Sequence, residues 1–206
     1  MKFDKQFETK LWNKIAEIEQ QSQIEIVVIV KQRSANYSDI PFAFAAVVVF
    51  LVFTYFMFAP TFFDDNFIYV GTILTFAIAY IGCMFFPSLT RLFITKKRML
   101  RMVEIYARAI FQKAGIHHTQ QKIGTLIYCS IFEKQTIVIA DRGAETALPA
   151  EEWQQIKDSF ANLFTSADPA QALLNDLEHY RPIFTQYLPP IENDINELPD
   201  SIMIDL

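Results

Sequence analysis

Two long apolar runs near the middle of the chain, Phe42–Phe63 and Phe67–Phe86, constrain the fold more than any other feature. They are 22 and 20 residues long, contain no charged side chain, and are separated only by Asp64-Asp65-Asn66. A helix rises about 1.5 Å per residue, so roughly 20 apolar residues cross a hydrocarbon core. Backbone groups inside lipid must bond within their own segment, which predicts a helix for each run. The sequence therefore predicts a transmembrane helical hairpin over residues 41–90.

The charges that flank this hairpin predict its orientation. Lys31 and Arg33 precede it, basic residues are dense between Arg91 and Arg101, and its central turn carries only acidic charge. Positive residues beside membrane spans stay in the cytoplasm. We therefore expect a multi-pass protein of a bacterial inner membrane with both termini in the cytoplasm. A pair of buried helices in a soluble protein is the alternative, but such helices rarely lack charge over so long a stretch twice in succession.

The overall charge of the chain argues against nucleic-acid binding. The net charge is −5, from 18 basic and 23 acidic residues, and five of the acids lie in the tail after Leu188. The rest of the chain is therefore neutral, unlike a nucleic-acid-binding domain. The basic cluster from Arg91 to Arg101 could contact RNA, but a positive flank on anionic lipid head groups explains it more simply. We interpret Cys83 and Cys129 as packing residues in a reducing compartment.

The remaining sequence predicts an α/β domain. An apolar stripe predicts a helix over residues 3–21, packed either on a sheet or on a membrane surface. β-branched runs predict strands, and with a helix near 99–114 they form a β-α-β unit whose two strands are parallel. Further helices are expected from Pro149 and from Asp168-Pro169 onward. The predicted strands are Ile24–Val30, Ile123–Phe132 and Thr136–Ala140.

These elements predict a small mixed β-sheet sandwiched by helices and interrupted by the transmembrane hairpin. The expected domain is discontinuous and comprises residues 1–38 and 96–188. Acidic residues and prolines over 189–206 predict a disordered tail.

The segment from Met102 to Trp153 resembles the TPM-domain family, whose members act in the thylakoid lumen, in photosystem repair and in receptor modulation. The resemblance implies a compact α/β/α sandwich. It also implies acid phosphatase activity in some members, binding of divalent cations such as calcium in some, and action through membrane-protein partners in several. The matching residues are Arg108-Ala109, Phe111, Gly115-Ile116, Thr119, Gly124–Ser130, Glu133 and Ile137–Gly143.

Asp141 is the leading candidate for a functional residue, because it ends a strand and precedes Arg142-Gly143. Glu133 and Glu145 lie near it in sequence, and the three carboxylates could hold a divalent cation such as Mg²⁺ or Ca²⁺. A simpler interpretation is that Asp141 caps a turn and pairs with Arg142. Arg108 and Arg142 could bind a phosphate, although Arg108 could equally anchor its helix to a carboxylate.

Other chemical motifs are weaker. His117-His118 could bind a metal, but solvated loop histidines fit better because zinc needs three or four ligands. Ser130, Asp141 and a histidine could form a triad only if the fold brings them together. We therefore expect an interaction or scaffold module that acts on another membrane protein, with a possible homo-oligomer. A metal-dependent phosphatase that uses the loop around Asp141 is the alternative.

Overall fold

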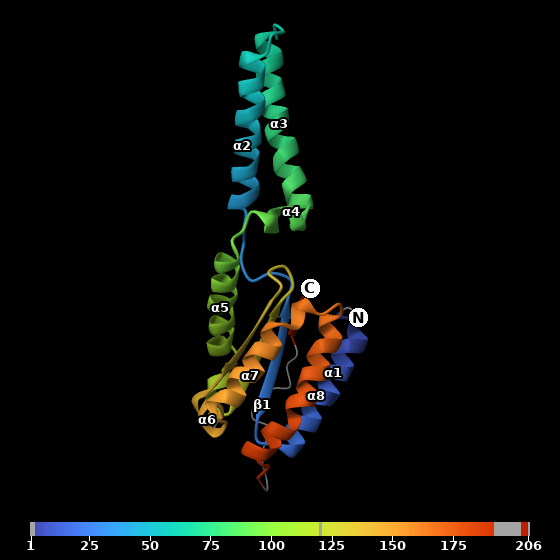
Figure 1. Cartoon of the computed structure of the whole chain (residues 1–206), viewed down its shortest axis with the longest axis vertical. Coiled ribbons are helices and arrows are strands. Elements are labelled where there is room, and N and C mark those ends of the chain that lie inside the picture. The colour runs from blue at the N-terminus through green and yellow to red at the C-terminus, as the bar shows by residue number, and fades with distance from the viewer. Residues whose placement is uncertain (1–2, 120, 192–202, 206) are drawn as a thin grey trace. The chain divides into compact units, whose positions relative to one another are not determined.

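The computed structural model describes residues 3–119, 121–191 and 203–205, which form two compact units. The α/β unit comprises Met1–Ser34 and Leu100–Leu206, and the hairpin unit comprises Ala35–Met99. Helix α5 carries the chain from the second unit back into the first. Figure 1 shows the elements of both.

The α/β unit contains a sheet and the helices that cover it. In chain order, its elements are α1 (Lys5–Gln21), β1 (Glu25–Lys31), α5 (Lys96–Lys113), η1 (Ile116–His118), β2 (Gly124–Ser130), β3 (Gln135–Ala140), α6 (Arg142–Ala147), α7 (Ala150–Ala161), η2 (Leu163–Thr165), α8 (Pro169–Tyr187) and β4 (Met203–Asp205). The hairpin unit contains α2 (Asp39–Phe58), α3 (Asp65–Phe85) and α4 (Pro87–Leu92), and it includes the first turn of α5.

The sheet has the strand order β3-β2-β1-β4 and mixed direction. β1 and β2 are parallel, in a register that runs from Glu25 opposite Gly124 to Lys31 opposite Ser130. β3 returns antiparallel to β2 through a tight turn in which Lys134 has a φ of 52°. The predicted β-α-β unit and β-hairpin are therefore confirmed.

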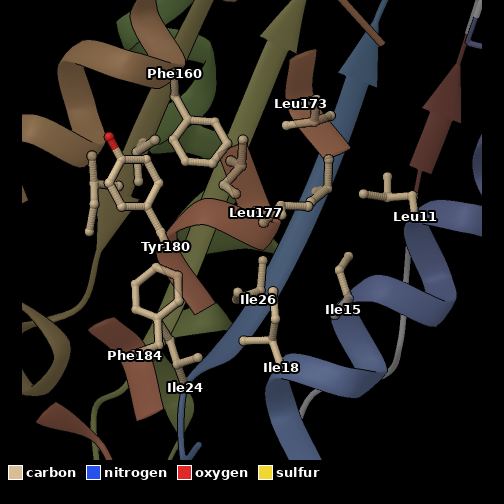
Figure 2. Packing of buried hydrophobic residues seen from close by; sticks show 14 of the residues in the cluster. Leu11, Ile15, Ile18, Ile24, Ile26, Phe160, Leu173, Leu177, Tyr180 and Phe184 are labelled. Atoms are coloured by element: carbon tan, nitrogen blue, oxygen red, sulfur yellow. The ribbon is translucent and has the colours of Figure 1, made fainter. Parts of the chain in front are cut away.

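Helices cover both faces of this sheet because alternate strand residues point to opposite sides. Ile26, Val28 and Val30 of β1 face α1, α7 and α8 and form the larger core (Figure 2). Val27 and Ile29 point the other way and pack with Val103, Ala107 and Phe111 of α5 in the smaller core. The predicted sandwich of a small mixed sheet between helices is correct.

Helix α1 packs on the sheet, which decides between its two predicted placements. Its carboxylate cap is Asp4, whose Oδ1 accepts from the Phe7 amide at 2.9 Å. The apolar stripe of the helix is buried in the larger core, and the helix lies beside α8 (Figures 1 and 2). The stripe residues are Phe7, Leu11, Ile15 and Ile18.

The outer edge of β1 is covered by two separate contacts. The Glu19 side chain accepts from the Ile26 amide at 2.9 Å, and β4 pairs in parallel with Ile29–Lys31. An uncovered strand edge would offer its free amides and carbonyls to other chains. Met203–Asp205, which lie in the predicted disordered tail, form this short strand, and the expectation for the rest of the tail stays a prediction. Residues 192–202 and 206 lie outside the described part of the chain.

In the hairpin unit, α2 and α3 lie side by side as an antiparallel pair (Figure 1). They are 20 and 21 residues long and are long and apolar enough to cross a membrane by length and composition. Few of their residues are buried, so they differ from the core helices of a soluble domain. Aromatic rings pack near the turn that joins them: the Phe63 and Phe67 rings stack at 5.5 Å, and Phe56 meets both rings edge-on.

Candidate functional site

Polar side chains gather at two opposite ends of the sheet. At the carboxyl ends of the parallel strands β1 and β2, a buried cluster contains Ser34, Tyr128, Ser130 and Glu133. We call these four residues the buried network. At the other end, Asp141 follows β3 beside Gly124, the first residue of β2.

The hydrogen bonds of the buried network form a single directed chain. Ser130 Oγ donates a short bond to Glu133 Oε2, and Ser34 Oγ donates to Ser130 Oγ at 2.8 Å. The single hydroxyl proton of Ser34 is thereby used, so Tyr128 must be the donor in its 2.8 Å contact with Ser34 Oγ. Glu133 Oε1 also accepts from the Ser34 backbone amide at 3.0 Å. The carboxylate therefore sets the direction of every proton in the chain.

Backbone contacts place this network where the chain leaves β1. The turn between β2 and β3 folds over that exit, because the Ile131 amide donates to Lys31 O at 3.0 Å and the Phe132 amide to Gln32 O at 2.9 Å. The Arg33 guanidinium lies 4.3 Å from the centre of the Phe132 ring. Ser34 is thus held from several sides immediately before the hairpin unit begins at Ala35.

Burial determines what the network can do chemically. Glu133 is fully buried, and burial raises the pKa of the Tyr128 phenol above its ordinary value. The hydroxyl protons of Tyr128, Ser34 and Ser130 are all donated within the network. Since substrate has no access to these atoms, the arrangement is suited to fixing the backbone at Ser34 rather than to hydrolysis.

Asp141 acts as the cap of α6, as the simpler interpretation of the sequence predicts. Its Oδ1 accepts from the Arg142 amide at 2.7 Å, and its own amide donates to Gly124 O at 2.8 Å. Its Oδ2 is buried and has no hydrogen-bond partner among the described residues. This oxygen is an acceptor available to a donor or a cation that the described residues do not supply.

The other residues predicted for this site do not surround Asp141. Glu145 pairs with Lys157 at 3.2 Å, and Glu133 belongs to the buried network at the opposite end of β3. Arg142 is exposed next to the cap, and Arg108 is exposed on α5. Within the described ranges no three His, Cys, Asp or Glu side chains could jointly hold a metal ion. The described structure therefore does not bring the three carboxylates of the predicted Asp141–Glu133–Glu145 site for Mg²⁺ or Ca²⁺ together, and the site stays a prediction.

The histidines and the proposed triad are likewise separated. Ser130 lies opposite Gln135, whereas Asp141 follows the residue opposite Thr125, so β2 separates the two side chains by its length. His117 and His118 lie in η1 with their rings 4.0 Å apart, after Gly115 in the left-handed conformation with a φ of 70°. His117 Nδ1 is buried without a partner in the described structure. The triad does not form.

Sequence reasoning missed two members of the buried network, Ser34 and Tyr128. The available signal was the pair Ser130 and Glu133, in which a hydroxyl ends an apolar strand three residues before a carboxylate. A buried carboxylate needs donors. Its partner Ser34 lies 96 residues away from Ser130 in the sequence, and no local pattern joins them.

Comparison with known proteins identifies the fold and one domain. No curated protein matches the chain. Among solved structures, it is similar to the NMR structure of the BA42 protein from the psychrophilic bacterium Bizionia argentinensis. The two share 16% sequence identity with a TM-score of 0.58 over 98% of this chain and 96% of that one, which is a likeness of fold. Residues 92–179, which extend from α4 into α8, match the family model of the TPM domain. The chain therefore carries a TPM domain, as its sequence resemblance indicates.

Proposed function

We propose that this protein is anchored in a bacterial inner membrane by the α2–α3 hairpin and that its TPM domain works in the cytoplasm as an interaction module for another membrane protein. The observation that carries the proposal is the exposure of large apolar side chains along both helices. Phe50, Leu51 and Ile78 are each more than 60% exposed. Contiguous apolar surface of this extent is costly in water at about 25 cal/mol per Å², and lipid removes that cost.

The charge distribution supports the proposed orientation. Asp64 and Asp65 lie at the turn of the hairpin, whereas Arg91, Lys96 and Lys97 lie at its base. Basic residues beside a span stay in the cytoplasm. The α/β unit, entered and left at the base of the hairpin, would then lie on the cytoplasmic side.

Cysteine labelling tests both the span and its direction. Asp65→Cys at the tip and Lys10→Cys on the exposed side of α1 are compared in intact cells with a membrane-impermeant maleimide. Both native cysteines are buried, so background labelling by the maleimide is low. The proposal requires labelling of the tip variant in intact cells and of the α1 variant only after permeabilisation. The reverse pattern would overturn the orientation, and recovery of the protein in the soluble fraction would overturn the anchor.

The exposed face of α5 is the surface we propose for the partner. Leu100 and Ile105 are exposed there, with Arg101 and Arg108 exposed beside them. Exposed apolar side chains rimmed by basic ones suit a partner with an apolar and acidic face. A photo-crosslinking residue at Ile105 is expected to yield a discrete adduct with an integral membrane protein, and the same residue at Lys10 is not. An adduct with a second copy of the chain would instead identify a homo-oligomer. The same crosslinked products at Ile105 and at Lys10 would refute the proposal that this face of α5 binds the partner.

A phosphatase is the second candidate, favoured by the buried Oδ2 of Asp141, which has no partner among the described residues and lies beside the exposed Arg142. The full protein in detergent is assayed with a generic phosphate ester, with added Mg²⁺, Mn²⁺ or Ca²⁺ and with chelator. Activity that is lost in Asp141→Asn, while the melting temperature is kept, would establish the enzyme. Equal activity in Asp141→Asn and the parent would remove Asp141 from consideration.

A further inference from the structure

We propose that the segment from Phe86 to Arg98, which we call the elbow, is a binding site for anionic phospholipid. It comprises α4 and the start of α5 within the hairpin unit. The inference rests on the proposed membrane anchor and adds a specific ligand class to it. The sequence already suggests that the basic cluster from Arg91 to Arg101 lies on anionic lipid head groups, but it does not predict the short helix α4 that shapes the elbow.

The elbow has a defined shape that turns apolar side chains outward. α4 begins at Pro87 and turns across the end of α3 (Figure 1). Thr90 Oγ1 fixes this turn by donating to Cys83 O at 2.9 Å, and Thr90 itself is buried. The Phe93 ring packs 5.4 Å from the Phe44 ring of α2. Of the other bulky side chains of the elbow, Phe86 and Leu92 are strongly exposed, whereas Ile94 is buried.

Positive charge lies next to these apolar side chains. Arg98 is neutralised, because its guanidinium donates to both carboxylate oxygens of Asp39 at 2.7 and 2.9 Å. Arg91, Lys96 and Lys97 have no acidic partner within the described ranges, and the Nε of Arg91 is buried without an acceptor. Among the described residues, three cations of the elbow are therefore uncompensated and one buried donor is unsatisfied.

Anionic phospholipid fits both halves of this surface. Its phosphate oxygens accept charge-assisted bonds from guanidinium and ammonium groups, and its acyl chains cover the exposed Phe86 and Leu92. Continuity with α3 places the elbow where a span meets the head groups. Free phosphate would satisfy the cations but leave the apolar side chains in water. The presence of both cations and exposed apolar side chains therefore favours a lipid.

Lipid-selective quenching tests the inference. Leu92→Trp places an indole on the most exposed apolar position of α4. The full chain is reconstituted in vesicles of phosphatidylcholine with a minor fraction of phosphatidylglycerol. Two preparations are compared: in one the phosphatidylcholine carries the bromine quencher, and in the other the phosphatidylglycerol carries it. The native tryptophans, Trp12 and Trp153, lie in the α/β unit, and the signal of the parent protein is subtracted. The ratio of the two quenching curves gives the relative binding constant of the anionic lipid.

We expect this constant to favour phosphatidylglycerol by about fivefold or more, since a lysine near an anionic surface contributes about that factor. Lys96→Gln with Lys97→Gln should lower it severalfold and leave the contribution of Arg91, and the matched charge loss Lys5→Gln with Lys10→Gln on α1 should leave it unchanged. Equal quenching by both lipids in the Leu92→Trp protein would overturn the lipid site while upholding the anchor. An equal loss of the preference for phosphatidylglycerol in both double variants would also overturn the lipid site, because it would indicate a general effect of net charge. Quenching by neither lipid would overturn the membrane anchor itself.

Discussion

Replacing Glu133 is the sharpest test of the buried network. Glu133→Ala removes the acceptor of two buried donors, the Ser34 amide and the Ser130 hydroxyl. A hydrogen bond to a charged group has a net value of about 1.5–3 kcal/mol. Relief of the buried charge offsets part of the loss. We therefore expect the α/β unit to be destabilised by about 3 kcal/mol.

Two conservative variants distinguish the loss of hydrogen bonds in the network from the loss of side-chain volume. Glu133→Gln keeps an acceptor for the Ser34 amide but presents a donor to Ser130, so every hydroxyl proton in the chain reverses. The Tyr128 oxygen then accepts from Ser34 Oγ, and the Tyr128 proton is left without an acceptor in the network, which costs about 1–2 kcal/mol. Tyr128→Phe removes only the first donor of the chain and should cost about 1 kcal/mol. We expect Glu133→Ala to be the most destabilising of the three variants, followed by Glu133→Gln and then by Tyr128→Phe.

Denaturant unfolding of the detergent-solubilised full chain measures this order. Both tryptophans lie in the α/β unit, and the buried Trp153 reports its unfolding. Glu145→Gln is the matched control, because its carboxylate is exposed and its pair with Lys157 contributes little. The reasoning is refuted if Glu133→Ala unfolds like the control, or if Tyr128→Phe costs as much as Glu133→Ala.

Three further predictions follow from buried or crowded groups. Gly124→Ala would place its Cβ 2.2 Å from Ile116 O, so we expect a loss of about 2 kcal/mol or more in the same unfolding assay. Burial raises the pKa of the Cys129 thiol to about 12, so Cys129 should resist maleimide at pH 8 until the protein is denatured, as counted by mass spectrometry. Burial also raises the pKa of Asp176 above its unfolded value, so its contribution to stability is lost as pH rises through the folded pKa. Asp176→Asn should therefore gain stability at neutral pH relative to the parent, and this advantage should shrink in acid; an unchanged pH profile would contradict it.

The sequence predicts long elements well and short ones poorly. The β-branched run of β1 and the apolar stripe of α1 follow from local chemistry, and both are confirmed. α4 and β4 are six and three residues long. Elements this short are stabilised by contacts outside themselves, such as the bond from Thr90 to Cys83 and the pairing with β1. No periodic pattern can develop over so few residues.

The predicted carboxylates are not brought together for a related reason. Glu133 and Asp141 are eight positions apart in sequence, which suggested proximity, but the six residues of β3 lie between them. At about 3.3 Å per residue, such a strand separates its ends by roughly 20 Å. Sequence distance is therefore misleading across a strand, whereas the long-range contact of Ser34 with Ser130 depends on the parallel pairing of β1 and β2.

The position of the buried network explains why its polar groups lie inside an otherwise apolar core. The hairpin unit is inserted between β1 and α5, and insertions are tolerated where the backbone on either side is fixed. On the α5 side, Val103, Ala107 and Phe111 fix the helix by packing on the sheet. The β1 side ends in an irregular connection, whose amides must find acceptors when buried. The Glu133 carboxylate supplies the acceptor for Ser34, the last residue of the α/β unit before the insertion. A catalytic carboxylate would need access to substrate, so the full burial of Glu133 favours a role in fixing the backbone at Ser34.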